Sequence, residues 1–202
     1  LPSFLFFYIF IWRERVLEKS SDIKKKKKKP GGGIPWAIRV FLVSVALSAV
    51  LSLLSNRALD GAGLPVAFLV LIGFIALGIL FDIVGVAVTA ADPKPFHSMA
   101  AHREKGAREA LRLLRSAGQV SSFCNDVVGD ICGIVSGTTA AVIVTALQDG
   151  FGLPSVLLSL VVTSLVSGLT IGGKALGKAL ALEKSTEVVH TVGRVLAVFS
   201  KQ

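Results

Sequence analysis

Four apolar stretches, each long enough to cross a lipid bilayer, constrain the fold of this chain more than any other feature. A helix needs about 20 residues to cross a hydrocarbon core about 30 Å thick, because each residue advances it by about 1.5 Å. The stretches are 36–55, 64–90, 120–147 and 153–173. We therefore expect an all-α fold, a polytopic membrane protein with about four transmembrane helices.

The composition agrees with this expectation and is unusual for a soluble domain. Hydrophobic residues make up 52% of the chain and its mean hydropathy is +0.71, yet Lys and Arg outnumber Asp and Glu by 22 to 13. The net charge of +9 raises the question of nucleic acid. However, the uninterrupted basic run 24–29 is followed by Pro30 and three glycines, without interleaved aromatic residues. We expect no nucleic-acid partner.

The charges between the apolar stretches follow the positive-inside rule, which places basic loops in the cytoplasm. Three basic segments fall on one side of the predicted membrane domain, namely 24–29, 94–115 and 174–201, and Arg57 is alone on the other side. The sequence therefore predicts a multi-pass protein of the cell (plasma) membrane with both termini in the cytoplasm.

Further segments flank or connect the predicted spans. An N-terminal apolar segment and a lysine-rich cytoplasmic linker, 1–35, precede the transmembrane helical domain, 36–202. Two interpretations of the linker stay open, contact with anionic lipid or a solvated tail that sets the topology. The segment 96–117 predicts a basic amphipathic helix along the cytoplasmic interface, and 174–200 predicts a cytoplasmic C-terminal helix. Membrane lipids are thus expected partners.

Three aspartates, Asp82, Asp126 and Asp130, lie within the predicted spans beside the polar Asn125. A carboxylate in hydrocarbon costs roughly 2.5 to 3.5 kcal/mol, so it is retained where it faces a cation, a cavity or a partner. At about 1.5 Å per residue, all three aspartates fall in the inner half of the membrane. Asp126 and Asp130 are four residues apart and share a helix face.

Oxygen ligands at this spacing suit hard cations such as Mg²⁺, Ca²⁺ or Na⁺. We expect one metal site with Asp82, Asn125, Asp126 and Asp130 as ligands, for Mg²⁺ or another hard cation such as Na⁺. A proton relay through the same residues is equally open. In the alternative interpretation, the carboxylates pair with Lys174 or Lys178 or are hydrated at the interface.

Glycines recur every four residues in the third span, at Gly129, Gly133 and Gly137. Small residues at this spacing let helix backbones approach closely, so the stripe predicts tight packing and a homodimer through this face. A broken helix that offers carbonyl oxygens to an ion is the alternative. Cys124 and Cys132 lie eight residues apart in the same span, so they cannot form a disulfide within it.

The order of these parts resembles the transmembrane module of the CorC and cyclin M (CNNM) magnesium transporters. The similar region, roughly 79–199, includes VGVAVTAA, then HREKGAREALRLLRSAGQVSSFCNDVVGDICG, then GGKALGKALALEKSTEVVHTVGRVLAVF. The resemblance implies a dimer in which polar side chains and main-chain carbonyls bind dehydrated Mg²⁺ near mid-membrane, with Na⁺ exchange as the proposed driving force. We expect a divergent relative without the CBS domains.

Residue by residue, the resemblance places Asn125 at the asparagine of the family's second helix. Asp82 falls where the family has a serine, and Gly85 where it has the acidic residue. Gly168 and Lys174 stand for a Gly-Glu-x-x-Pro-Lys feature whose glutamate and proline are absent here. Only Asn125 is therefore a like-for-like match.

The sequence thus predicts transport of a divalent, Mg²⁺-like cation through an intramembrane carboxylate and amide site, and no catalytic or cofactor-binding residues. The alternative is a non-transporting scaffold or accessory subunit, whose glycine face binds another membrane protein and whose aspartates pair with that partner's basic residues. A third possibility is a membrane enzyme that uses the same aspartates as acid and base groups.

Overall fold

The computed structural model describes residues 34–61, 63–151 and 155–199. The predicted N-terminal segment and linker, up to residue 33, lie outside these residues. The chain divides into two compact units, Leu1–Arg39 and Val40–Gln202. All packing described below lies within the second unit.

Every regular element of the described residues is a helix, which confirms the predicted all-α fold. The elements are α2 (Ile34–Leu59), α3 (Leu64–Ala90), α4 (Pro93–Ala101), α5 (Ala107–Arg115), α6 (Ala117–Ser122), the π-helix η1 (Phe123–Gly129), α7 (Asp130–Phe151), α8 (Ser155–Glu183) and α9 (Ser185–Phe199). Four continuous helical segments are long and apolar enough to cross a membrane: Ala37–Leu59, Leu64–Ala90, Ala117–Gly150 and Val156–Glu183. This is the architecture of a polytopic membrane protein.

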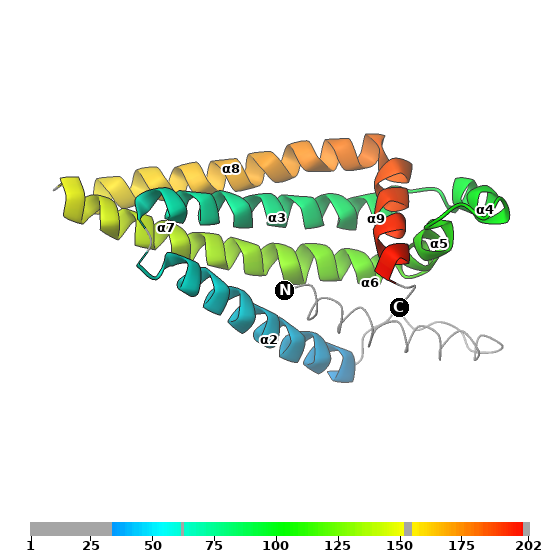
Figure 1. Cartoon of the computed structure of the whole chain (residues 1–202), viewed down its shortest axis with the longest axis horizontal. Coiled ribbons are helices and arrows are strands. Elements are labelled where there is room, and N and C mark those ends of the chain that lie inside the picture. The colour runs from blue at the N-terminus through cyan, green and yellow to red at the C-terminus, as the bar shows by residue number, and fades with distance from the viewer. Residues whose placement is uncertain (1–33, 62, 152–154, 200–202) are drawn as a thin grey trace. The chain divides into compact units, whose positions relative to one another are not determined.

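Helices α3, α7 and α8 lie side by side and form the centre of the second unit (Figure 1). Apolar residues spaced three or four apart on α3 face its neighbours, so Leu71 and Ile75 pack against Ile143 of α7. The outward side of α8 instead exposes large apolar side chains such as Leu157, Leu165 and Leu169. Such a surface suits lipid and would be unfavourable in water.

Helix α2 packs on the opposite side of the long third segment. Leu51 of α2 is buried with Val127, Ile131 and Val135. These three residues are spaced four apart, which keeps them on one face of the helix. One polar contact crosses this face, between the hydroxyls of Ser55 and Thr139 at 3.3 Å.

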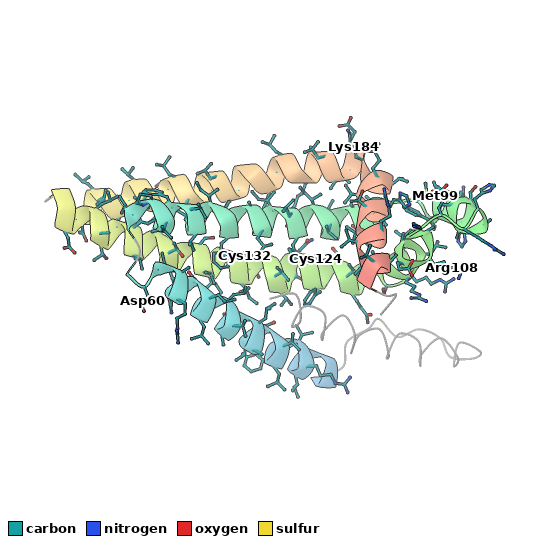
Figure 2. The ribbon with its side chains drawn as sticks, viewed as in Figure 1. Asp60, Met99, Arg108, Cys124, Cys132 and Lys184 are labelled. Carbon is teal, nitrogen blue, oxygen red and sulfur yellow. The ribbon has the colours of Figure 1, made fainter. Side chains whose placement is uncertain are left out.

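The predicted interfacial helix 96–117 is in fact divided into two short helices, α4 and α5. The break falls between them because Gly106 adopts a left-handed φ of +89°, which a residue with a side chain rarely takes. Helix α5 buries Ala107, Ala110 and Leu113 against the rest of the unit. Basic side chains gather at this end of the bundle, where Figure 2 labels Arg108 and Lys184.

Helix α9 crosses the end of the bundle at a close contact between two glycines (Figure 1). A Cβ built on Gly193 would lie 2.5 Å from the carbonyl oxygen of Gly106 and 3.0 Å from the Cβ of Ala110. Since the nearest atom belongs to the backbone, it cannot move aside at low cost. Glycine at position 193 is therefore required for α9 to seat on α5.

Gly193→Ala is expected to lower the free energy of unfolding by about 1 to 2 kcal/mol, because overpacking outweighs the better helix propensity of alanine. Thermal denaturation of the purified protein in detergent measures the change. The matched control is Gly172→Ala, since a Cβ there would have no described atom within 4 Å. Equal stability of the two variants would contradict the proposed role of the glycine contact.

The helix that contains the fourth predicted span extends further than expected. The sequence criterion ended it at residue 173 because lysine follows, and it assigned 174–200 to one cytoplasmic helix. In the structure α8 continues to Glu183, and α9 begins at Ser185. The ammonium of Lys178 lies 4.0 Å from the carboxylate of Asp82 on α3, and that of Lys174 lies beside Gly129 of η1.

Candidate intramembrane ion site

The third membrane segment, Ala117–Gly150, changes from α-helix to π-helix at residues that the sequence predicted to be functional. Residues 123–129, FCNDVVG, form a π-helix between α6 and α7, and this stretch contains Asn125 and Asp126. A π-helix bonds each N–H to the carbonyl five residues earlier, and it occurs frequently at functional sites. The helix is therefore widened here, and it is neither broken nor regular.

Helix α3 approaches this π-helix closely at two glycines one heptad apart. A Cβ built on Gly78 would lie 3.2 Å from the Cβ of Cys132 and 3.9 Å from the carbonyl oxygen of Gly129. A Cβ on Gly85 would overlap the side-chain amide of Asn125. Asp82 lies on α3 between these two glycines and is itself buried.

Asp82 is buried, with 4% of its surface exposed. Its Oδ2 lies 4.0 Å from the Nζ of Lys178 on α8, which is within ion-pair range but longer than a hydrogen bond. This oxygen has no hydrogen-bond partner among the described residues. The predicted alternative of an aspartate paired with Lys178 is thus seen for Asp82, although the pair is loose.

Asn125 supplies the second polar group of the contact. Its Nδ2 donates a hydrogen bond to the Oγ of Ser121, one turn earlier, at 3.3 Å. Its Oδ1 is buried and, within the part of the chain that the structure describes, accepts no hydrogen bond. Asp82 and Asn125 therefore present two unsatisfied acceptor oxygens on facing helices.

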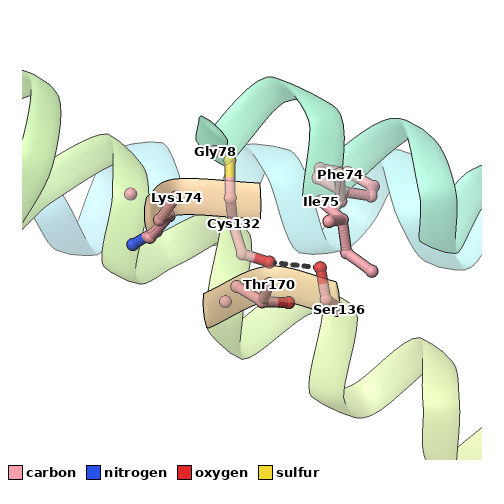
Figure 3. A pocket seen from close by; sticks show the side chains of 9 residues that line it. Phe74, Ile75, Gly78, Cys132, Ser136, Thr170 and Lys174 are labelled. Carbon is pink, nitrogen blue, oxygen red and sulfur yellow. Dashed lines mark hydrogen bonds between the residues drawn. The ribbon is translucent and has the colours of Figure 1, made fainter. Parts of the chain in front are cut away.

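Lys174 lies on α8 one turn before Lys178. The Nζ of Lys174 would be 3.4 Å from a Cβ on Gly129. Its side chain lines a small cavity together with Cys132, Ser136 and Thr170 (Figure 3). The cavity measures about 10 Å³, room for roughly one water molecule. In Figure 3 the Ser136 Oγ donates to the carbonyl of Cys132 at 2.7 Å. Lys174 thus lines a cavity with both apolar and hydroxyl-bearing side chains.

Asp126 and Asp130 lie apart from this cluster, on the exposed side of their helix. Among the described residues, no three His, Cys, Asp or Glu side chains come close enough to hold a metal ion. The three aspartates therefore do not meet within one chain, and their joint role as ligands stays a prediction.

The predicted glycine stripe is also divided between two surroundings. Gly129 is buried beside Lys174, whereas a Cβ on Gly133 or Gly137 would have no described atom within 4 Å. The open part of the stripe therefore lies on the same exposed side as Asp126 and Asp130. Cys124 and Cys132 are free and buried, as expected from their spacing, and both are labelled in Figure 2.

The glycines that set these distances were not predicted from the sequence as helix contacts. Gly173 and Gly177 of α8 lie against Ile79 and Ile83 of α3, which brings Lys174 and Lys178 to the site. Their spacing of four residues, and the spacing of seven between Gly78 and Gly85, are signals of close helix packing that could have revealed the contact.

The fold and these contacts define the class of the chain, an all-α polytopic membrane protein whose bundle encloses unsatisfied polar groups at a close helix contact. Comparison with protein-family models, with curated proteins and with solved structures gives no match. The resemblance to the CorC and cyclin M transporters therefore stays a prediction.

Proposed function

We propose that this protein transports a cation across the membrane and that Asp82 and Asn125 form its binding step within the bundle. One observation carries the proposal: Asp82 Oδ2 and Asn125 Oδ1 are both buried without a hydrogen-bond partner among the described residues. Each unsatisfied acceptor costs about 1 to 3 kcal/mol, and more when it is charged. A cation or a proton between the helices removes both penalties.

The chemistry of the cluster suits passage of an ion better than permanent storage. A structural metal site encloses its ion with a full ligand set, whereas the buried acceptors of α3 and η1 are one carboxylate and one amide. An ion on a transport path must bind strongly enough to enter and weakly enough to leave. The widened turn of η1 beside Asn125 supports the same interpretation, because such turns recur at functional sites.

The predicted homodimer fits this proposal through the exposed side of the third segment. Asp126 and Asp130 would face lipid in a lone chain, at a cost of roughly 2.5 to 3.5 kcal/mol each. A second copy that packs on Gly133 and Gly137 would cover them, and cations would offset the repulsion between the facing carboxylates. The same proposal includes the cell (plasma) membrane as the location and cytoplasmic termini.

Flux of Mg²⁺ and Na⁺ into liposomes that contain the purified full chain tests the proposal. Asn125→Ala is expected to lower cation flux about 5- to 10-fold, the equivalent of about 1 to 1.4 kcal/mol for one lost neutral ligand. Asp149→Asn, an exposed carboxylate near the end of α7, is the matched control and should retain full flux. Wild-type flux in Asn125→Ala would remove this residue from the path.

The same assay decides the role of the two exposed carboxylates. If Asp126 and Asp130 are ligands in the homodimer, Asp126→Asn and Asp130→Asn each reduce flux. Unaltered flux in both variants would show that the proposed path runs through Asp82 and Asn125 without them.

The second candidate is an accessory subunit of a larger membrane complex. It is favoured by the exposure of Asp126 and Asp130 beside the open Gly133 and Gly137, because a partner helix with a basic residue would cover this side equally well. Purification in mild detergent separates the candidates. A stoichiometric partner protein supports the subunit, whereas a homodimer with bound cation supports transport.

A further inference from the structure

We propose that Lys178 is a tethered competitor for the carboxylate of Asp82, and that it restricts the transported ion to a monovalent cation. This inference rests on the proposed function and names the class of its substrate. It differs from the divalent cation expected from the sequence, because it depends on a contact between α3 and α8 that only the structure shows.

The two partners of the ion pair differ in how firmly they are held. The Asp82 side chain is 6% exposed, whereas that of Lys178 is 54% exposed. The backbone next to Lys178 is held in place, because Gly177 packs closely against Ile83 of α3. A Cβ built on Gly177 would lie 2.8 Å from the Cγ1 of Ile83. Thus only the flexible end of Lys178 is free to leave the carboxylate.

When the ammonium of Lys178 leaves Asp82, it can reach the membrane interface. Lys178 lies five residues before the end of α8 at Glu183, which is about 8 Å along the helix. Lysine side chains near a helix end extend along apolar surface and place the ammonium in the interface. The distance of 4.0 Å without a hydrogen bond shows that the paired arrangement is not locked.

The charges around Asp82 determine which ion can replace the ammonium. Helix α8 presents Lys178 and, one turn earlier, Lys174, while η1 presents the neutral Asn125. Asp126 lies on the exposed side of η1, and no cluster of three possible metal ligands forms among the described residues. Among the described residues, the carboxylate of Asp82 thus forms one ion pair, with the ammonium of Lys178.

A monovalent cation restores the charge balance of this pair after Lys178 withdraws. A divalent cation would leave one excess positive charge in the low dielectric of the bundle, and the return of Lys178 to Asp82 would add a second. The exchange of Lys178 for a cation therefore favours Na⁺ or a proton over Mg²⁺. In this scheme Lys178 is a residue that sets specificity, and Asp82 and Asn125 are the ligands.

Lys178→Met tests the proposal, because methionine keeps the apolar stem and removes the charge. Purified full-length protein is placed in liposomes with an imposed Na⁺ gradient or pH gradient, and Mg²⁺ is added as a competitor. We expect monovalent flux in the wild type that millimolar Mg²⁺ does not inhibit. In Lys178→Met, Mg²⁺ should bind at least 10-fold more tightly and inhibit that flux.

Two matched variants isolate the effect of charge. Lys178→Arg keeps a positive charge and should retain the wild-type resistance to Mg²⁺. Lys184→Met removes an exposed lysine just beyond the end of α8 and should behave as the wild type. A thermal shift with Na⁺ and with Mg²⁺ in detergent provides a second measure of binding that does not depend on transport. Lys178→Gln serves as a second neutral variant if the methionine variant fails to fold.

The outcomes separate this inference from the proposed function. Flux driven by Na⁺ or by the pH gradient supports the inference in either case and identifies the monovalent ion. Mg²⁺ transport by the wild type, or unchanged resistance to Mg²⁺ in both neutral variants, overturns the inference while cation transport stands. Absence of any cation flux or cation-induced thermal shift in the wild type overturns the proposed function as well.

Discussion

Asp82→Asn is expected to reduce cation flux about 100-fold or more while the protein stays folded and equally stable. The carboxylate supplies the negative charge of the proposed binding step, and loss of a charged partner at a buried site is worth about 3 kcal/mol or more. Stability should not fall, because Lys178 is half exposed and can place its ammonium in the interface. An amide at position 82 also removes the cost of burying an unsatisfied charge.

The role of Asp82 is tested by comparing the effect of Asp82→Asn on flux with its effect on stability. Liposome flux and thermal denaturation in detergent are recorded on the same preparation, with Asp60→Asn as control for an exposed carboxylate at the far end of α2 (Figure 2). A large loss of stability with unchanged flux per folded molecule would mean that Asp82 is only a structural partner of Lys178.

Gly85→Ala is expected to reduce flux by about 30-fold, the second largest effect and larger than that of Asn125→Ala, because separation of α3 from η1 would also displace Asp82. The new Cβ would overlap the side-chain oxygen and carbon of Asn125, so the amide must rotate away or α3 and η1 must separate. Overpacking of this kind costs about 1 to 3 kcal/mol. Alanine recovers up to about 1 kcal/mol through helix propensity, so the folded state survives while the ligand geometry is lost.

Gly73→Ala on the same helix is the matched control, because a Cβ at that position would have no atom within 4 Å in the described parts of the chain. Its flux should equal that of the wild type. If Gly85→Ala and Gly73→Ala transport equally well, the position of the Asn125 amide does not matter for function.

Gly85 and Gly73 also show what can and what cannot be predicted from the sequence. Both residues lie in the second apolar stretch, whose predicted limits, 64–90, are those of α3. The apolar length of this stretch sufficed there, because Pro65 at its start and Pro93 beyond its end mark its boundaries. The environment of each glycine, in contrast, depends on which neighbour lies against it.

The boundaries of two other predicted helices differ from those in the structure, and each difference has a physical reason. The sequence separated the fourth span, up to residue 173, from a helix over 174–200, because a lysine inside a membrane helix is costly unless another segment supplies a polar partner; α8 instead continues to Glu183. The interfacial helix was predicted as one piece because its apolar residues keep a helical spacing across Gly106. Only the contact of Gly106 with α9 shows why the chain turns there.

The candidate site was predicted in part. The sequence identified Asp82 and Asn125 as polar groups at similar depth, and named Lys178 as one possible counter-ion. It could not tell that Asp82 turns inward while Asp126 and Asp130 turn outward. The face on which a helical residue lies follows from spacing, but which face is covered follows from packing.

The sequence by itself determined that the chain is helical, that four segments are long and apolar enough to cross a membrane, and that carboxylates lie within them. These properties depend on local composition, since length and hydropathy decide whether a helix suits a bilayer. Only the tertiary structure decided that Asp82 pairs with Lys178 and that Asn125 lies against Gly85, since both contacts depend on glycines that bring α3 close to α8 and η1. Removing a Cβ leaves hydropathy almost unchanged, yet it determines which backbones can touch and hence which charges meet.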